Sequence, residues 1–179
     1  MANYLLDLDT KDIYISLFQE YIGVPLDPEH DNLNWCGGAG DMLAFDPDGI
    51  AYPCIRYMES SLGDSAKPII IGDVHGLLQT EEQKEWNNRL NCMTRCSQST
   101  DECIYCPVAS GCAWCSGWNY QQFGKLNKRS TNICWMHKAR VLANYYYWNN
   151  YYRKYQIEKG FVLNLSQEDI KAILGNEFS

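Results

Sequence analysis

The sequence lacks any long hydrophobic run. Its aliphatic run Ile69–Ile71 is only three residues long, whereas a helix that crosses a membrane needs roughly 20 apolar residues. The first twelve residues contain three aspartates and offer neither the basic n-region nor the apolar h-region of a secretory signal. We therefore expect no membrane partner, no secretion and a cytoplasmic location.

Positive charge is also scarce. The chain has 15 basic and 22 acidic residues among 179, which gives a net charge of -7. Such a chain would repel phosphate, so we expect no nucleic-acid partner. The one local cationic group, Lys125, Lys128 and Arg129, either keeps a loop solvated or attracts an acidic peptide. The length and the 46% apolar content fit one folded domain, or a domain and a half.

Histidine pairs at metal-binding spacing are missing. His30, His75 and His137 stand apart, and none lies four residues from another, so we assign them no function and expect His137 at a helix surface or cap. Aromatic residues, by contrast, are dense from Tyr145 to Tyr152. At helical spacing such residues usually form core or interface, although they can also stack on a substrate.

The local patterns predict a small α+β fold. A β-hairpin is expected because Asp46–Gly49 offers turn residues between two short extended runs. We expect the long stretch from Cys92 to Cys115 to be a metal-stabilised loop flanked by helices, because it has no hydrophobic period. The other expected elements are one or two helices within 2–21, a break at 24–28, a strand over 68–72, a helix opened by the Thr80 capping box, a long helix from Cys134 to Tyr155, and a last helix from Ser166 to Leu174.

The nine cysteines are the most informative residues. Two stand apart, and the other seven lie within 92–134. The odd count leaves one thiol unpaired in any all-disulfide scheme, and such clustering is typical of metal ligands in a reducing compartment. Cys103-x2-Cys106-x5-Cys112-x2-Cys115 could close one four-thiolate zinc site, with Cys115 or Cys134 as the last ligand. That interpretation leaves Cys36 and Cys54 without a role.

The full cysteine order resembles the seven-cysteine signature of the SPASM domain, the C-terminal extension of many radical SAM enzymes that modify peptides. The matching pattern is Cys36-x12-Gly49-x4-Cys54, a gap, the four central cysteines, a second gap and Cys134. It departs from the signature at one point, since two residues and not three separate Cys112 from Cys115. The resemblance covers about residues 30–155. The short sequence segments around these cysteines are similar to those of maturases that act on cysteine-repeat peptides.

The resemblance implies two auxiliary 4Fe-4S clusters, with zinc as a substitute when iron is lost. It assigns Cys36, Cys54 and Cys115 to the first cluster, and Cys103, Cys106, Cys112 and Cys134 to the second. It also implies a precursor peptide as substrate, and electron transfer or substrate binding as the function. The first cluster then lacks a fourth ligand, which is either an open iron or one of the two spare thiols, Cys92 and Cys96. The helical spacing of that pair slightly favours the open iron.

A radical SAM barrel is missing from the sequence. Its CxxxCxxC loop has one near match, Cys92-x3-Cys96, but Ser99 stands where the third cysteine should be. The resemblance therefore implies that the barrel lies in cis outside this sequence, that this chain binds no SAM, and that it has no turnover alone. We expect 1–30 to be a remnant of a barrel helix, 31–135 the auxiliary domain and 136–179 C-terminal helices. A structural zinc module and a stand-alone ferredoxin-type protein are the alternatives.

Overall fold

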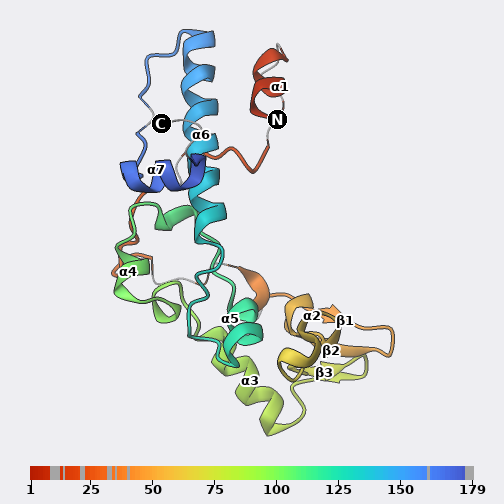
Figure 1. Ribbon diagram of the computed structural model, residues 1–179. Helices are drawn as coiled ribbons and strands as arrows, with labels where there is room; N and C mark the ends of the chain where they lie inside the picture. Colours follow the sequence, from red (N-terminus) through yellow and green to blue (C-terminus); the bar gives the residue numbers. More distant parts are fainter. Residues whose placement is uncertain are drawn as a thin grey trace. The chain divides into compact units, whose positions relative to one another are not determined.

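The chain forms two compact units that interleave along the sequence (Figure 1). The computed structural model describes residues 1–8, 13, 15–20, 23–31, 34, 36–39, 41–160 and 162–175. Unit 1 comprises 1–26, 105–112 and 132–179, and unit 2 comprises 27–104 and 113–131. Helices and one small antiparallel sheet make up the described part, which confirms the predicted α+β class.

Unit 2 contains the sheet, whose strand order is β1-β2-β3-β4 with every neighbouring pair antiparallel. The predicted hairpin is confirmed, because Ala44 pairs with Tyr52 across its two strands. Its turn depends on Asp46, whose carboxylate accepts the N–H groups of Asp48 and Ile50 at 3.0 and 2.9 Å. Gly49 supplies the positive φ of 81° that this turn requires. The strands are β1 (Ala44–Phe45), β2 (Ile50–Tyr52), β3 (Gly72–Asp73) and β4 (Gly76–Leu77).

The strand predicted over 68–72 is wrong in its position, because β3 begins only at Gly72. The aliphatic residues before it serve the core, since Ile69 and Ile71 are both buried. Their N–H groups donate to the carbonyls of Tyr57 and Ala51, at 3.2 and 2.9 Å. Burial and hydrogen bonds to these carbonyls therefore determine the conformation of this segment, and its β-branched composition alone does not.

The helices of unit 2 follow local signals in part. α3 (Glu81–Asn91) begins with the predicted capping box, in which the Thr80 hydroxyl accepts from the N–H of Gln83 at 3.2 Å and the Gln83 side chain accepts from the N–H of Thr80 at 3.1 Å. α5 (Ser116–Phe123) was not predicted, although Gly124 ends it in the left-handed conformation typical of a helix C-terminus. The shorter elements are η1 (Gly37–Ala39), η2 (Ile55–Tyr57), α2 (Glu59–Leu62), η3 (Gly63–Ser65), η4 (Cys96–Gln98) and α4 (Asp101–Ile104).

The core of unit 2 combines a hydrophobic cluster with one buried amide. The hydrophobic cluster includes Tyr57, Leu90, Tyr120 and Cys54. Beside it, the fully buried Asn119 donates to the Gln98 side chain at 3.0 Å and to the Leu126 carbonyl at 2.9 Å. Hydrogen bonds to this amide thus stabilise part of the loop that we expected metal ligands to hold.

Unit 1 is built on the long helix α6 (Cys134–Tyr155), which confirms the predicted helix. α1 (Ala2–Asp7) and α7 (Gln167–Leu174) both contact it, and η5 (Ala109–Gly111) completes the unit. The predicted cap of α7 is confirmed, since the Ser166 hydroxyl accepts from the N–H of Asp169 at 3.0 Å. The rest of the region predicted as one or two helices within 2–21 either lies outside the described residues or forms no regular helix.

Aromatic side chains of α6 pack mainly inside unit 1, as one interpretation of their helical spacing predicted. Tyr147 stacks on Phe18 with ring centroids 4.6 Å apart, and Trp148 contacts both Tyr147 and Tyr152. The prediction for His137 is wrong: this side chain is buried, and its Nε2 lies 2.5 Å from the Val108 carbonyl oxygen.

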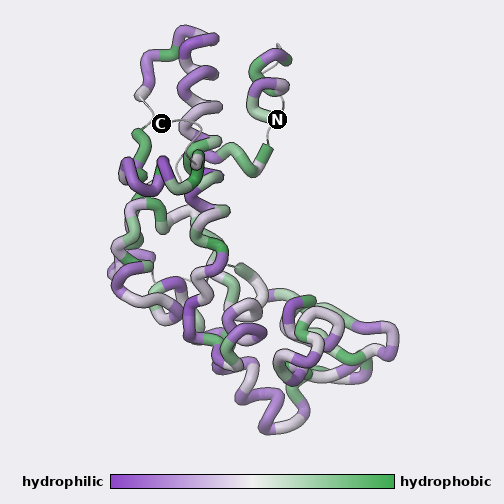
Figure 2. Tube along the Cα trace, viewed as in Figure 1, coloured by the Kyte–Doolittle hydropathy of each residue, from purple (hydrophilic) through white to green (hydrophobic). Residues whose placement is uncertain are grey.

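Hydrophilic residues recur along α6 (Figure 2). In the part of the chain that the structure describes, no helix has the length and apolar character that a membrane span requires.

Candidate metal centre

Three of the predicted ligands, Cys36, Cys54 and Cys115, belong to unit 2. They lie directly before η1, η2 and α5, and 78 residues separate the first from the last. Cys36 and Cys54 meet at Gly38, because a Cβ built on this glycine would lie 3.5 Å from the Cys36 sulfur and 3.4 Å from the Cys54 sulfur. The missing side chain of Gly38 therefore leaves space beside both sulfurs.

The charge of Cys115 acts on the Cys54 thiol, as does the charge of Cys36. Burial is the main cause that raises the pKa of the Cys54 thiol, and the charges of Cys115 and Cys36 raise this pKa further. An N–H group of the backbone acts in the opposite sense, since Arg56 donates to the Cys54 sulfur at 3.4 Å. Neighbouring thiolates disfavour one another's ionisation, and a bound cation removes that penalty.

The segments that carry Cys54 and Cys115 are joined directly. The buried Tyr57, in η2, has its hydroxyl 2.6 Å from the hydroxyl of Ser116, the first residue of α5. Gly117 permits this approach, because a Cβ there would lie 2.6 Å from the Arg56 Cβ. A residue with a side chain at 117 would push α5 away from η2, so this glycine helps to bring the two cysteine segments together.

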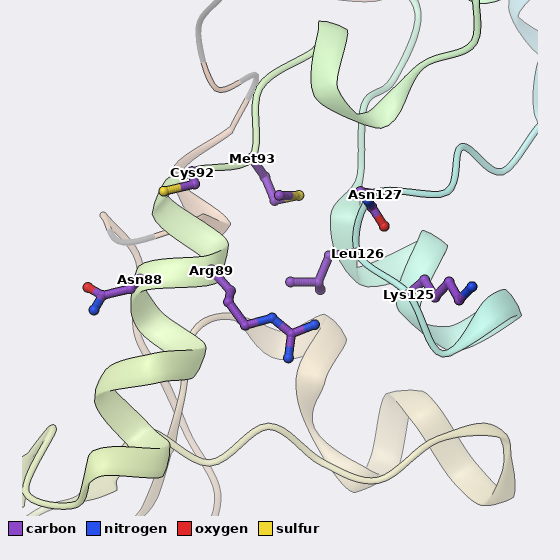
Figure 3. A pocket seen from close by; sticks show the side chains of 7 residues that line it. All are labelled: Asn88, Arg89, Cys92, Met93, Lys125, Leu126 and Asn127. Carbon is purple, nitrogen blue, oxygen red and sulfur yellow. The ribbon is translucent and has the colours of Figure 1, made fainter.

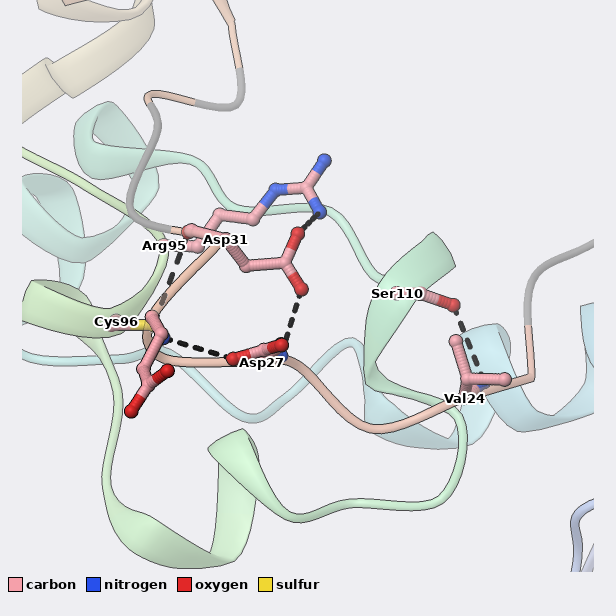
Figure 4. A network of polar contacts seen from close by, with 7 residues as sticks. Val24, Asp27, Asp31, Arg95, Cys96 and Ser110 are labelled. Carbon is pink, nitrogen blue, oxygen red and sulfur yellow. Dashed lines mark hydrogen bonds and ion pairs between the residues drawn. The ribbon is translucent and has the colours of Figure 1, made fainter.

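The first spare thiol, Cys96, has different neighbours. Its Sγ lies 3.9 Å from the Asp31 carbonyl oxygen, and the Asp31 carboxylate pairs with Arg95 at 3.4 Å and accepts the N–H of Asp27 at 2.8 Å. Figure 4 shows these contacts among the labelled residues. Burial is the main cause that raises the pKa of Cys96, followed by the charge of Asp31. None of the other eight cysteines contributes to that shift.

The second spare thiol, Cys92, follows the last residue of α3 and is exposed. It borders a cavity of about 590 Å³ whose other lining residues are Asn88, Arg89, Met93, Lys125, Leu126 and Asn127. In Figure 3 Arg89 extends toward Leu126, whereas the sulfur of Cys92 points away from both. No second cysteine lines this cavity. Among the described residues, neither spare thiol has a hydrogen bond with Cys36, Cys54 or Cys115, although α3, which ends one residue before Cys92, contacts η1, which follows Cys36.

The remaining four predicted ligands are divided between the units. Cys103 lies in α4 of unit 2, whereas Cys106, Cys112 and Cys134 belong to unit 1. Cys106 packs against the buried pair Val108 and Val141. Its carbonyl accepts the N–H of Ala109 at 3.0 Å. The assignment of these four cysteines to one cluster stays a prediction from the sequence.

A single zinc ion and an iron-sulfur cluster require different distances between thiolate sulfurs. Among the described residues, no three Cys, His, Asp or Glu side chains form a group that could hold one metal ion. Thiolates around one zinc ion lie about 3.8 Å apart, given tetrahedral geometry and a Zn–S bond of about 2.3 Å. The thiolate ligands of a 4Fe-4S cluster bind separate irons and so lie farther apart. The space at Gly38 beside the Cys36 and Cys54 sulfurs, and the backbone N–H on the Cys54 sulfur, are features that a cluster bound by these thiols would use.

Two polar residues of this site were missed by sequence reasoning. Tyr57 and Ser116 lie three residues after Cys54 and one residue after Cys115, so only their proximity to the cysteines could have singled them out. A third residue of the site, Gly38, lies against two thiol sulfurs. No family model, no curated protein and no solved structure matches the chain.

Proposed function

We propose that the chain is the auxiliary iron-sulfur domain of a radical SAM enzyme that modifies a ribosomal peptide. The observation that carries the proposal is the grouping of Cys36, Cys54 and Cys115 in unit 2. The seven-cysteine pattern assigns these three to one cluster, and the fold brings them together from distant parts of the sequence. Zinc would instead be expected at Cys103, Cys106, Cys112 and either Cys115 or Cys134, and neither set gives Cys36 and Cys54 a role.

The side chains of Cys36, Cys54 and Cys115 would hold the first 4Fe-4S cluster, and the Arg56 N–H would donate to the Cys54 sulfur. When bound, such a cluster supplies one-electron transfer and, with three protein ligands, an iron that accepts an external ligand. The contact of Cys96 with the Asp31 carbonyl oxygen favours this open coordination over Cys96 as the fourth ligand. A thiolate of the precursor peptide is the external ligand that we propose.

The remaining parts of the proposal come from the sequence. Cys103, Cys106, Cys112 and Cys134 would hold the second cluster with four protein ligands. The radical step would belong to a barrel in cis, so the chain alone would have no turnover. Bound metal would also stabilise unit 2, because Cys54 belongs to its hydrophobic cluster.

The test is anaerobic reconstitution of the full chain, followed by iron and sulfide analysis. Two clusters correspond to about eight irons per chain. Cys36→Ala, Cys54→Ala and Cys115→Ala should each reduce the content to about four irons, while Cys92→Ala and Cys96→Ala should retain eight. The two spare cysteines are matched controls, because each change removes one thiol from the same unit.

Two results would contradict parts of this proposal. A colourless, folded protein with stoichiometric zinc and no iron would overturn the iron-sulfur assignment in favour of a structural zinc module. A loss of four irons in Cys92→Ala or Cys96→Ala would identify that cysteine as the fourth ligand. The open coordination position, and with it the binding of a peptide thiolate, would then be wrong.

A further inference from the structure

The hydroxyl groups of Tyr57 and Ser116 have one more proton than their shared hydrogen bond uses. Each hydroxyl has one O–H, and their oxygens lie 2.6 Å apart, so one O–H donates to the other oxygen. Both residues are buried, with 1% and 7% of their surface exposed. Neither hydroxyl makes a second hydrogen bond to any residue that the structure describes. The second O–H is thus a buried donor that needs an acceptor.

The acidity of the two groups indicates which proton is left over. A phenol is a stronger donor than an aliphatic hydroxyl, and an aliphatic hydroxyl oxygen is the better acceptor. We therefore take Tyr57 as the donor to Ser116, which leaves the Ser116 O–H free to turn. A hydroxyl that already accepts one hydrogen bond is polarised and donates more strongly.

Two of the proposed thiol ligands, Cys54 and Cys115, lie close to this hydroxyl pair in the sequence and are its candidate acceptors. Ser116 directly follows Cys115, and the N–H of Tyr57 donates to the carbonyl of Cys54 at 3.1 Å. Burial is the main cause that raises the pKa of Tyr57, and the charges of Cys54, Cys115 and Cys36 raise it further. The hydroxyl pair therefore lies in the field of all three proposed ligands.

We propose that Ser116, polarised by Tyr57, donates a hydrogen bond to a sulfur of the first cluster and thereby raises the reduction potential of that cluster alone. This inference rests on the proposed function. A hydrogen bond to sulfur stabilises the reduced, more negative state more than the oxidised state. Ser116 and Tyr57 are thus tuning and positioning residues, because neither binds iron.

The experiment is a redox titration of the reconstituted chain, followed by the spectroscopic signal of each reduced cluster. Ser116→Ala should retain about eight irons and shift the first cluster to a more negative potential, by about a tenfold change in its oxidised-to-reduced ratio, or ~59 mV for one electron. Tyr57→Phe should shift it in the same direction by less, since Ser116 keeps its O–H. Ser116→Thr, which keeps the hydroxyl, should restore the original potential.

Tyr120→Phe is the matched control for Tyr57→Phe. Tyr120 belongs to the same hydrophobic cluster, but its hydroxyl donates to the Lys67 carbonyl at 3.0 Å and not toward a cysteine. Its removal should leave both potentials unchanged. Full iron content with an unchanged potential in Ser116→Ala would overturn this inference and leave the proposed function standing. Absence of iron from the unsubstituted chain would overturn the proposed function itself.

Discussion

Different interactions stabilise the two units. Unit 1 uses aromatic contacts along α6 and polar ties such as Asn144, whose side chain donates to the Leu17 carbonyl at 3.0 Å. In unit 2 the hydrophobic cluster includes one of the grouped thiols, Cys54, and the adjacent Tyr57. The comparison teaches that aromatic packing and polar contacts hold α6 in unit 1, whereas in unit 2 a grouped thiol is itself part of the hydrophobic core, so that the chemistry of the thiols and the stability of the core are linked.

Removal of metal should therefore have the largest effect, and around the thiols of unit 2 it should exceed the effect on the part of α6 that follows Cys134, the last ligand proposed for the second cluster. In the reconstituted chain, we expect chelation under oxidising conditions to lower the amide protection of 36–57 and 113–120 by more than tenfold. The amides of α6 from Val141 to Tyr152 should change by less than twofold. Hydrogen exchange with mass spectrometry measures both regions in one sample. Equal loss of protection in both units would show that the metal stabilises the entire chain and would break the comparison.

Truncation of a core residue should have the next largest effect. Tyr57→Ala removes a buried ring from unit 2 and should cost about 3–5 kcal/mol. Phe18→Ala removes the ring that stacks on Tyr147 in unit 1 and should cost a similar amount there. Urea unfolding followed by regional hydrogen exchange separates the two effects. If both substitutions lowered protection throughout the chain, the units would not unfold independently.

Loss of a helix cap should have a smaller effect on each unit. Thr80→Ala removes the capping box of α3 in unit 2, and Ser166→Ala removes the cap of α7 in unit 1. Each should cost about 1 kcal/mol, or about fivefold faster exchange of amides in the affected helix. Each variant is the control for the other. A fivefold change in α7 on replacement of Thr80 would contradict the division into units.

The smallest expected effect concerns the hairpin of unit 2 at high pH. Burial is the main cause that raises the pKa of Tyr52 to about 12, and its 2.8 Å hydrogen bond to the Asp46 carboxylate adds to the shift. Because the pKa of Tyr52 is raised above its ordinary value of 10.0, its contribution to stability is complete below pH 10 and is lost as the pH rises to about 12.

Carbon-13 labelling of the tyrosine Cζ atoms, with NMR detection, measures this titration. Asp46→Asn removes the charge that opposes ionisation and should bring the pKa of Tyr52 closer to 10. Asp48→Asn is the control, since Asp48 contributes the least of the named charges to the shift. An unchanged Tyr52 titration in Asp46→Asn would show that burial alone causes the raised pKa.

Elements specified by nearby residues could be predicted from the sequence. The turn at Asp46, the capping box at Thr80 and the cap at Ser166 each depend on contacts within four residues. The strand at 68–72 was misplaced because Ile69 and Ile71 take distant carbonyls as partners. His137 was wrongly expected at the surface because its partner, the Val108 carbonyl, lies 29 residues away.

The candidate site also has a part that the sequence predicts and a part that it does not. The chemistry of its ligands follows from the cysteine types and their pattern, but spacing alone could not bring Cys36 and Cys54 to Cys115. That grouping depends on Gly117, which allows α5 to approach η2, and on the buried hydrogen bond between Tyr57 and Ser116. These contacts join parts of the chain separated by about 60 residues, for which one sequence contains no periodic signal.

At position 38, stability and open space beside the thiols favour different residues. A methyl group at this position would make ordinary van der Waals contact with the sulfurs of Cys36 and Cys54. Replacement by alanine would also restrict the unfolded chain, a gain of about 0.4–1 kcal/mol where the backbone tolerates it. Selection for stability alone would thus favour a methyl group in the space beside the thiols. Glycine at this position is the residue expected when that space must admit something larger than a methyl group.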